Sequence, residues 1–128
     1  MGEVAYTVRA SFTDRGLADA WLRWLRGGHV TDVLAGGATT AEVIALDGPD
    51  IAYEARYRFP SREVFERYER EHAPRLRAEG LRLFPVEKGV GYCRSVGVVL
   101  DRFPESPWPA APGGSAAASP HPPGPGRP

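Results

Sequence analysis

Two nine-residue stretches in which the side chains alternate between apolar and polar constrain the fold of this chain most. In residues 4–12 the even-numbered positions are apolar, and the odd-numbered ones carry Ala5, Thr7, Arg9 and Ser11. In residues 51–59 the odd-numbered positions are apolar, and Ala52, Glu54, Arg56 and Arg58 occupy the others. A period of two is typical of a strand with one buried face. The sequence therefore predicts two long strands, each with one face in the core and one polar face.

A helix is predicted between these strands. Thr13 or Asp14 can cap its start, and apolar residues then recur at helical spacing: Leu17, Trp21, Trp24 and Leu25. We expect this helix to end at the Gly27-Gly28 pair, where a left-handed turn causes no Cβ strain. Residues 29–34 are then expected to form a separate short helical turn.

The remaining elements complete a recognisable order. Residues 38–46 form a hairpin with 51–59 across a turn-rich segment, a second helix opens at Pro60-Ser61, and residues 90–100 supply the last strand. Pro74 should kink or restart the second helix, which we expect to end at Gly80. The order strand, helix, strand, strand, helix, strand predicts an α+β fold of the ferredoxin-like type, βαββαβ, with an antiparallel sheet and both helices on one face.

Composition divides the chain and limits its partners. Residues 104–128 hold nine of the thirteen prolines and only two charged side chains, so we expect a globular domain at 1–103 and a disordered tail at 104–128. Sixteen basic and sixteen acidic residues give no net charge, which argues against nucleic acid as a partner. No apolar run is long enough to span a membrane, there is no signal-peptide pattern, and the single cysteine fits a reducing compartment. The expected location is the cytoplasm.

Several blocks of residues resemble a known family. They are Trp21-Leu22-Arg23-Trp24-Leu25, His29-Val30-Thr31-Asp32-Val33-Leu34, Ser61-Arg62-Glu63, and Ala73-Pro74-Arg75-Leu76-Arg77-Ala78-Glu79-Gly80-Leu81. From about residue 4 to 100 the chain resembles the bacterial family labelled domain of unknown function 4286. That family is similar to the dimeric α+β barrel superfamily, which includes antibiotic-biosynthesis monooxygenases and small isomerases. The resemblance implies the fold and a homodimer in which a second copy covers the polar sheet face, but no particular reaction.

His29 and Asp32 are the candidate catalytic pair. Their spacing places both side chains on one side of a helical turn, where a carboxylate could orient an imidazole and raise its basicity. The structural alternative is that His29 satisfies the last carbonyls of the first helix and Asp32 caps the next turn. Capping needs no partner beyond the backbone and is the favoured alternative.

The candidate ligand-binding residues are Arg9, Trp24, Glu54 and Arg56. Arginines on the polar face could receive an anion inside a dimer, because the planar guanidinium suits carboxylate or phosphate. Alternatively they pair with glutamate across strands of a solvated sheet. Trp24 could border a pocket while Trp21 anchors the core, or both could be core.

Metal and cofactor chemistry has no support in the pattern. The three histidines lack zinc-ligand spacing, there is no glycine-rich phosphate loop, and Cys93 lies in a strand where thiols are usually small buried side chains. Two functions from different classes remain. The first is a dimeric module that binds a small polar or anionic molecule or only oligomerises. The second is a cofactor-independent isomerase or monooxygenase-like enzyme that uses His29 and Asp32.

Overall fold

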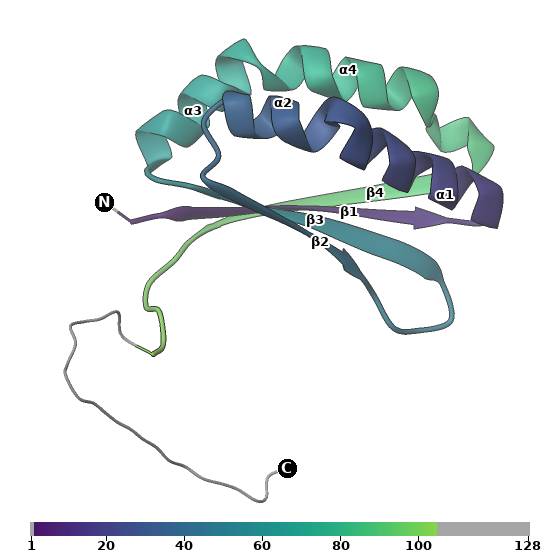
Figure 1. The fold of residues 1–128 in the computed structure, drawn as a ribbon, viewed down its shortest axis with the longest axis horizontal. Coiled ribbons are helices and arrows are strands. Elements are labelled where there is room, and N and C mark those ends of the chain that lie inside the picture. Colours follow the sequence, from purple (N-terminus) through teal and green to yellow (C-terminus); the bar gives the residue numbers. More distant parts are fainter. Residues whose placement is uncertain (1, 105–128) are drawn as a thin grey trace, which may run out of the picture.

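The computed structural model describes residues 2–104, which form one sheet with a layer of helices on it (Figure 1). The elements follow in the order β1 (Val4–Phe12), α1 (Arg15–Trp24), η1 (Leu25–His29), α2 (Val30–Ala35), β2 (Thr40–Ala45), β3 (Ile51–Phe59), α3 (Arg62–Glu71), α4 (Ala73–Leu83), η2 (Val86–Lys88) and β4 (Val90–Val98). The expected tail at 104–128 lies, apart from Pro104, outside the described residues.

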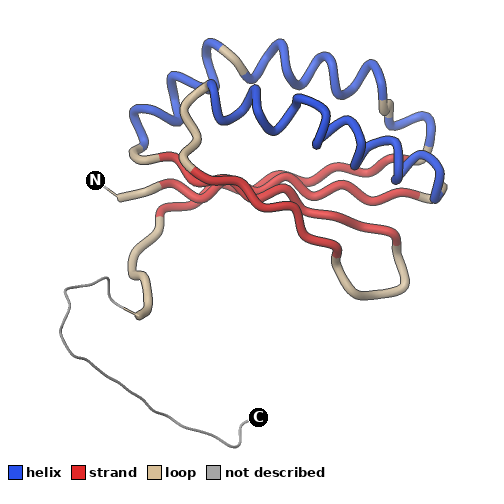
Figure 2. The backbone as a smooth tube through the Cα atoms, viewed as in Figure 1, coloured by secondary structure: helices blue, strands red, loops and turns tan. Residues whose placement is uncertain are grey.

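The sheet has the predicted ferredoxin-like arrangement. Its strand order is β2-β3-β1-β4, and each neighbouring pair is antiparallel. The helices of residues 2–104 all lie on one face of the sheet, and none of these helices covers the other face (Figure 2). The α+β fold class predicted from the sequence is therefore confirmed.

The strand predictions follow the structure closely because both long strands are half buried. β1 and β3 have the predicted bounds, and they pair along their whole length from Val4 opposite Phe59 to Phe12 opposite Ile51. β4 ends at Val98, two residues before the expected end. The alternation places the apolar side chains of both central strands beneath the helices.

The predicted end of the first helix was wrong. Asp14 caps α1 as expected, since its carboxylate accepts a hydrogen bond from the Leu17 N–H at 2.7 Å. The chain then passes through the π-helical turn η1 directly into α2, with the Val30 N–H donating to the Leu25 carbonyl. Gly28 takes a φ of 157° inside this turn, so the glycine supplies a kink rather than a stop.

The second helix restarts where proline requires it. α3 ends at Glu71, and Pro74 lies in the first turn of α4, where its missing N–H breaks no hydrogen bond. The expected end at Gly80 was wrong, since α4 continues to Leu83 and the Gly80 carbonyl accepts from the Phe84 N–H. A side chain at Gly80 would meet the ring of Trp24, which explains glycine inside a helix at this position.

The core consists of two clusters of buried side chains. One surrounds Tyr6, Phe59 and Tyr68 under α2, α3 and α4, and the other surrounds Phe12, Trp21 and Tyr53 under α1. Aromatic rings pack stacked, tilted or edge-on within the clusters, for example Phe59 edge-on to Phe65 at 5.1 Å between ring centroids. Residues of both clusters line the cavity described below.

Candidate functional site

A cavity of about 370 Å³ lies between the sheet and the helices, at the junction of the two core clusters. Three small residues open this space. Val8 and Ala55 are paired across β1 and β3 in the middle of the sheet, and Gly80 lies on α4. Larger side chains at the two strand positions would extend into the gap. Its size falls within the range of about 300–1,000 Å³ that is typical of small-molecule sites.

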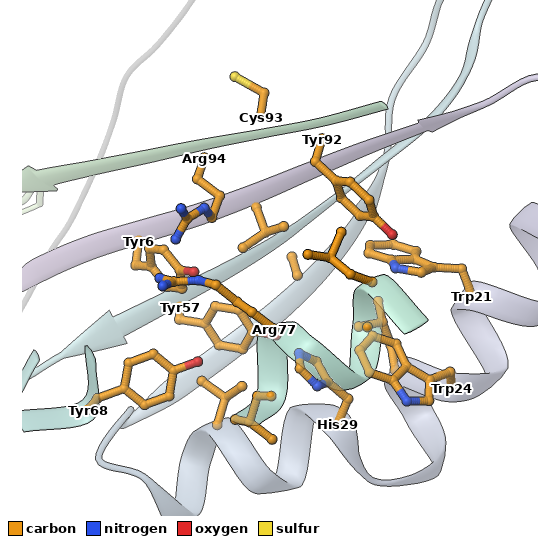
Figure 3. Close-up of a pocket in the computed structure, with 17 residues that line it drawn as sticks. Tyr6, Trp21, Trp24, His29, Tyr57, Tyr68, Arg77, Tyr92, Cys93 and Arg94 are labelled. Carbon is orange, nitrogen blue, oxygen red and sulfur yellow. The ribbon is translucent and has the colours of Figure 1, made fainter. Parts of the chain in front are cut away.

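Aromatic rings make up much of the cavity wall (Figure 3). Trp24 is half-buried on the last turn of α1 and packs against Phe84 at 5.6 Å between ring centroids. Trp21 and Tyr57 are buried in the core clusters and also line the cavity. The sequence-predicted candidate Trp24 therefore lies in the wall of a pocket, and Trp21 is both a core residue and a lining residue.

The π-helical turn brings His29 into this wall. The kinked η1 joins α1 to α2 without a break, so Trp24 before the kink and His29 at its end line the same cavity. π-helical turns within α-helices are frequent at functional sites. In Figure 3 the His29 ring projects from the helix layer toward the cavity interior, beside Trp24.

The environment of His29 keeps its imidazole neutral. Its ring stacks on Trp24 at 4.1 Å between centroids, and Nδ1 is buried without a hydrogen-bond partner among the described residues. Burial lowers the pKa of His29 from 6.5 to about 4, and the charge of Asp32 opposes this shift only in part. Asp32 is itself exposed and accepts no hydrogen bond from Nδ1 of His29. The predicted pair is therefore near in space but is not a hydrogen-bonded dyad.

A second group of polar side chains borders the cavity, which we call the arginine end: Tyr6, Tyr68, Arg77 and Arg94. Nη2 of Arg77 donates to both carboxylate oxygens of Glu69, at 2.9 and 2.7 Å. Burial acts to lower the pKa of Arg77, but the hydrogen bonds with Glu69 and Tyr6 outweigh it, so this pKa is raised. Arg77 therefore remains charged beside the cavity.

The phenols near the arginine end stay protonated. Burial raises the pKa of Tyr68 and of Tyr57 above the usual value of 10.0. Tyr6 adds to the rise at both hydroxyls, whereas the charges of Arg77 and Arg94 act against it at Tyr68. A protonated phenol is a hydrogen-bond donor, so these groups can donate to an acceptor in the cavity.

The sheet separates Arg9, Glu54 and Arg56 from the cavity. They lie on the face without helices, where Arg9 is opposite Glu54 and the Arg56 guanidinium contacts the Glu54 carboxylate at 2.7 Å. Within one protomer these arginines and His29 lie on opposite faces of the sheet and do not border the same cavity. The Arg56–Glu54 ion pair lies within β3, so it differs from the cross-strand pairing considered from the sequence.

Residues that sequence reasoning missed include Tyr57, Tyr68, Arg77 and Arg94. One signal for Arg94 was available, since the alternation of the last strand puts Val90, Tyr92, Arg94, Val96 and Val98 on one face. A charged side chain on the apolar face of a strand is unusual and points to a special environment. Arg77 gave a weaker signal through its helical spacing from Ala73 and Gly80, two residues of the inner face of α4.

Other chemistry has little support in the described part of the chain. Residues 2–104 contain no group of three or more acidic, histidine or cysteine side chains that could hold a metal ion. The expectation of a buried thiol was wrong, because Cys93 is exposed and Figure 3 shows it pointing away from the cavity. Among the helices of this described part, none combines the length and the apolar character that a membrane span requires.

Solved structures with this fold include proteins of different kinds. A dimeric ferredoxin-like protein from an uncultured marine organism is 13% identical, with a TM-score of 0.61 over 80% of this chain and 99% of that chain. A mutant form of SnoaB, a cofactor-independent oxygenase from Streptomyces nogalater, is 15% identical, with a TM-score of 0.61 over 82% of this chain and 100% of that chain. At these identities the likeness shows the fold alone.

A further neighbour is a putative antibiotic biosynthesis monooxygenase from Bacillus cereus, 12% identical, with a TM-score of 0.57 over 80% of this chain and 97% of that chain. No curated protein matches the sequence. The family described as "Domain of unknown function (DUF4286)" matches residues 4–90. That match spans more than half of the sequence and agrees with the resemblance noted from its residues, so the chain belongs to the DUF4286 family.

Proposed function

We propose that this protein binds a small molecule with an apolar, ring-shaped body in the cavity between its sheet and its helices. The observation that carries the proposal is a cavity of about 370 Å³ whose wall includes Trp21, Trp24 and Tyr57. A void of this size in a small domain forgoes packing interactions, which a ligand would restore. Flat aromatic walls favour a planar occupant.

Binding rather than catalysis is the favoured function because His29 is a weak base. With a pKa of about 4, its imidazole has little affinity for a proton at neutral pH. Taking a proton from a group with the acidity of a phenol, pKa about 10, would be uphill by roughly 8 kcal/mol. A proton acceptor tuned for neutral pH would have a pKa near 7.

The test uses two bicyclic probes, 2-naphthoate and its neutral isostere 2-naphthamide, with tryptophan fluorescence and thermal shift as measurements. Binding of either probe supports the proposal. Val8→Phe should fill the cavity from β1 and abolish binding, whereas Thr7→Phe on the other face of the same strand should leave it intact. Binding that survives Val8→Phe and is lost in Thr7→Phe would place the ligand on the open side of the sheet instead. If neither probe binds to the unaltered protein, the proposal fails.

A second candidate function is cofactor-independent catalysis. One observation favours it: His29 lines the cavity, and its buried Nδ1 has no hydrogen-bond partner among the described residues, as is common for a group kept for chemistry rather than packing. A substrate with a more acidic proton would reduce the cost of transfer. SnoaB, which has the same fold, is described as a cofactor-independent oxygenase. Under this candidate, His29→Gln abolishes turnover of a bound substrate while its binding persists.

We also propose that the protein works as a homodimer joined through the uncovered face of the sheet. This open face includes Arg9, Arg56 and Arg58 together with the acidic side chains Glu42 and Glu54. Two-fold pairing puts the same patch on both sides, and a patch of mixed sign can then be self-complementary. One solved structure of this fold is described as dimeric. Leu100 and Phe103, just after β4, are 86% and 84% exposed, which adds apolar surface for association.

The dimer is tested by the molar mass in sedimentation equilibrium. Replacing Arg9 and Arg56 together by glutamate should convert the dimer into a monomer through like-charge repulsion. Arg67→Glu, an equally simple charge reversal at an exposed position of α3, should leave it dimeric. A monomeric unaltered protein at micromolar concentration would overturn this part of the proposal.

A further inference from the structure

The polar groups of the cavity are gathered at one end, and they point to the class of ligand. In an inference that rests on the proposed ligand cavity, we propose that Arg77 and Arg94 bind the carboxylate of a small aromatic acid whose ring lies between Trp24, His29 and Tyr57. The ligand is thus a monoanion with a planar apolar body. Its acidic group, rather than its ring, decides which molecules are accepted.

The two guanidinium groups converge although they come from different layers. Arg94 lies on β4 next to Val8 of β1, on the face of the sheet that the helices cover, and Arg77 comes from α4 above it. Both charges act on the Tyr68 hydroxyl, so both lie close to it. Figure 3 shows the two guanidinium groups on the same side of the cavity, beside Tyr6.

Arg77 keeps hydrogen-bonding capacity that the protein does not use. Both of its bonds to Glu69 come from a single nitrogen, Nη2. Its Nε is buried and has no partner among the described residues. A buried donor without a partner is costly to the folded protein.

The charge at this end favours an anion that carries one negative charge. Arg77 and Arg94 are positive, and Glu69 neutralises one of them, while Arg94 forms no ion pair within residues 2–104. None of the described side chains that line the cavity is acidic, and His29 is neutral at pH 7. One positive charge is therefore uncompensated. A dianion such as a phosphate monoester would exceed this one uncompensated positive charge.

The opposite end of the cavity fits a ring. Trp24 and His29 form a stacked pair with an interplanar angle of 23°, so a further ring can stack only on an outer face of this pair. Gly80 lies directly against Trp24, since even a methyl group there would approach the ring at 3.2 Å. An aromatic acid can therefore place its ring against an outer face of the pair while its carboxylate reaches the arginines.

The experiment compares 2-naphthoate with 2-naphthamide, which differ in charge but hardly in shape. We expect the unaltered protein to bind the acid at least about tenfold more tightly than the amide, because a charge-assisted hydrogen bond contributes about that much affinity. Arg94→Met, which keeps most of the length of the side chain, should remove most of this preference and leave the affinity for the amide nearly unchanged. Equal affinity for the two probes overturns the inference while the proposed cavity stands, and binding of neither probe overturns the cavity itself.

Glu69→Gln supplies a second variant with an effect of opposite sign. Removing this negative charge should tighten 2-naphthoate binding about tenfold and leave 2-naphthamide unaffected. A merely structural contribution of the Arg77–Glu69 pair would weaken both probes or neither. Weaker binding of the acid in Glu69→Gln would therefore overturn the assignment of Arg77, and an unchanged preference in Arg94→Met would overturn that of Arg94.

Discussion

The stability of this protein should fall as the pH is lowered from about 6.5 to 4, and His29 should account for a large part of the fall. In the unfolded chain His29 takes up a proton near its usual pKa of 6.5, but in the folded protein burial lowers this pKa to about 4. Between these values the unfolded state binds the proton and the folded state does not, so acid favours unfolding. The full difference corresponds to about 3 kcal/mol, of which roughly 2 kcal/mol is lost by pH 5.

The assay is urea denaturation at pH 7 and pH 5 for the unaltered protein and for His29→Gln. Glutamine has a similar size and polarity but no charge to gain. The free energy of unfolding should fall by roughly 2 kcal/mol more in the unaltered protein than in the variant, since all other titrating groups are shared. Because the difference between proteins is compared at each pH, the intrinsic cost of the substitution cancels.

A direct measurement complements the denaturation curves. The NMR shift of the His29 ring proton should titrate with a midpoint well below 6.5, and Asp32→Asn should lower the midpoint further, because the Asp32 charge raises it. Equal pH dependence in the two proteins, or a His29 midpoint at or above 6.5, would refute the reasoning. Either result would mean that the imidazole is solvated rather than buried against Trp24.

Three other predictions concern the backbone and the tyrosines. Gly28→Ala should cost about 1–3 kcal/mol of stability in thermal unfolding, since alanine rarely adopts its φ of 157°, whereas Gly27→Ala, with open space around it, should be neutral or stabilise by up to about 1 kcal/mol. Asp14→Ala should destabilise by about 1 kcal/mol in the same assay, because it removes the cap of α1. Stability should also fall as the pH rises above about 10, because Tyr57 and Tyr68 ionise readily only when unfolded; absorbance at alkaline pH should show them ionising together with unfolding.

The sheet was predictable because its information is local. In residues 4–12 and 51–59 the alternation of apolar and polar side chains indicates which ones are buried, and the observed register pairs the two strands from end to end. Such alternation survives folding because a slip of one residue would expose every apolar side chain. The turn-forming residues between the second and third strands likewise predict a hairpin.

The helix ends were harder because glycine has more than one role. The pair at 27–28 fits a left-handed stop equally well from the sequence, but it forms the kink of a π-helical turn. Gly80 resembles a helix end, whereas its function is to let Trp24 approach α4 closely. At Gly80 a partner distant in the sequence, Trp24, decides the outcome, and neither spacing nor propensity identifies that partner.

The cavity could not be predicted from the sequence, because it lies where small residues of different elements leave the space between them unfilled. It opens where Val8, Ala55 and Gly80 come from three different elements and meet across one gap. Each of them is unremarkable in its own segment. Reasoning from polarity led instead to the arginines of the open face, because several of them occupy polar positions in strands with clear alternation. It did not lead to Arg94, a single charged residue on an apolar face.

The two faces of the sheet carry the two functions that we propose for this protein, ligand binding and dimerisation. The covered face holds a ligand cavity whose polar end contains Arg77 and Arg94, and the open face carries Arg9, Arg56 and their acidic partners. Alternation along a strand lets neighbouring residues serve different purposes: Val8 belongs to the cavity and Arg9 to the open face. Substitutions on the open face can therefore change association without entering the cavity, and substitutions in the cavity can change ligand preference without altering the surface for a second copy. A fold whose strands are half buried on one side and free on the other permits this separation within about a hundred residues.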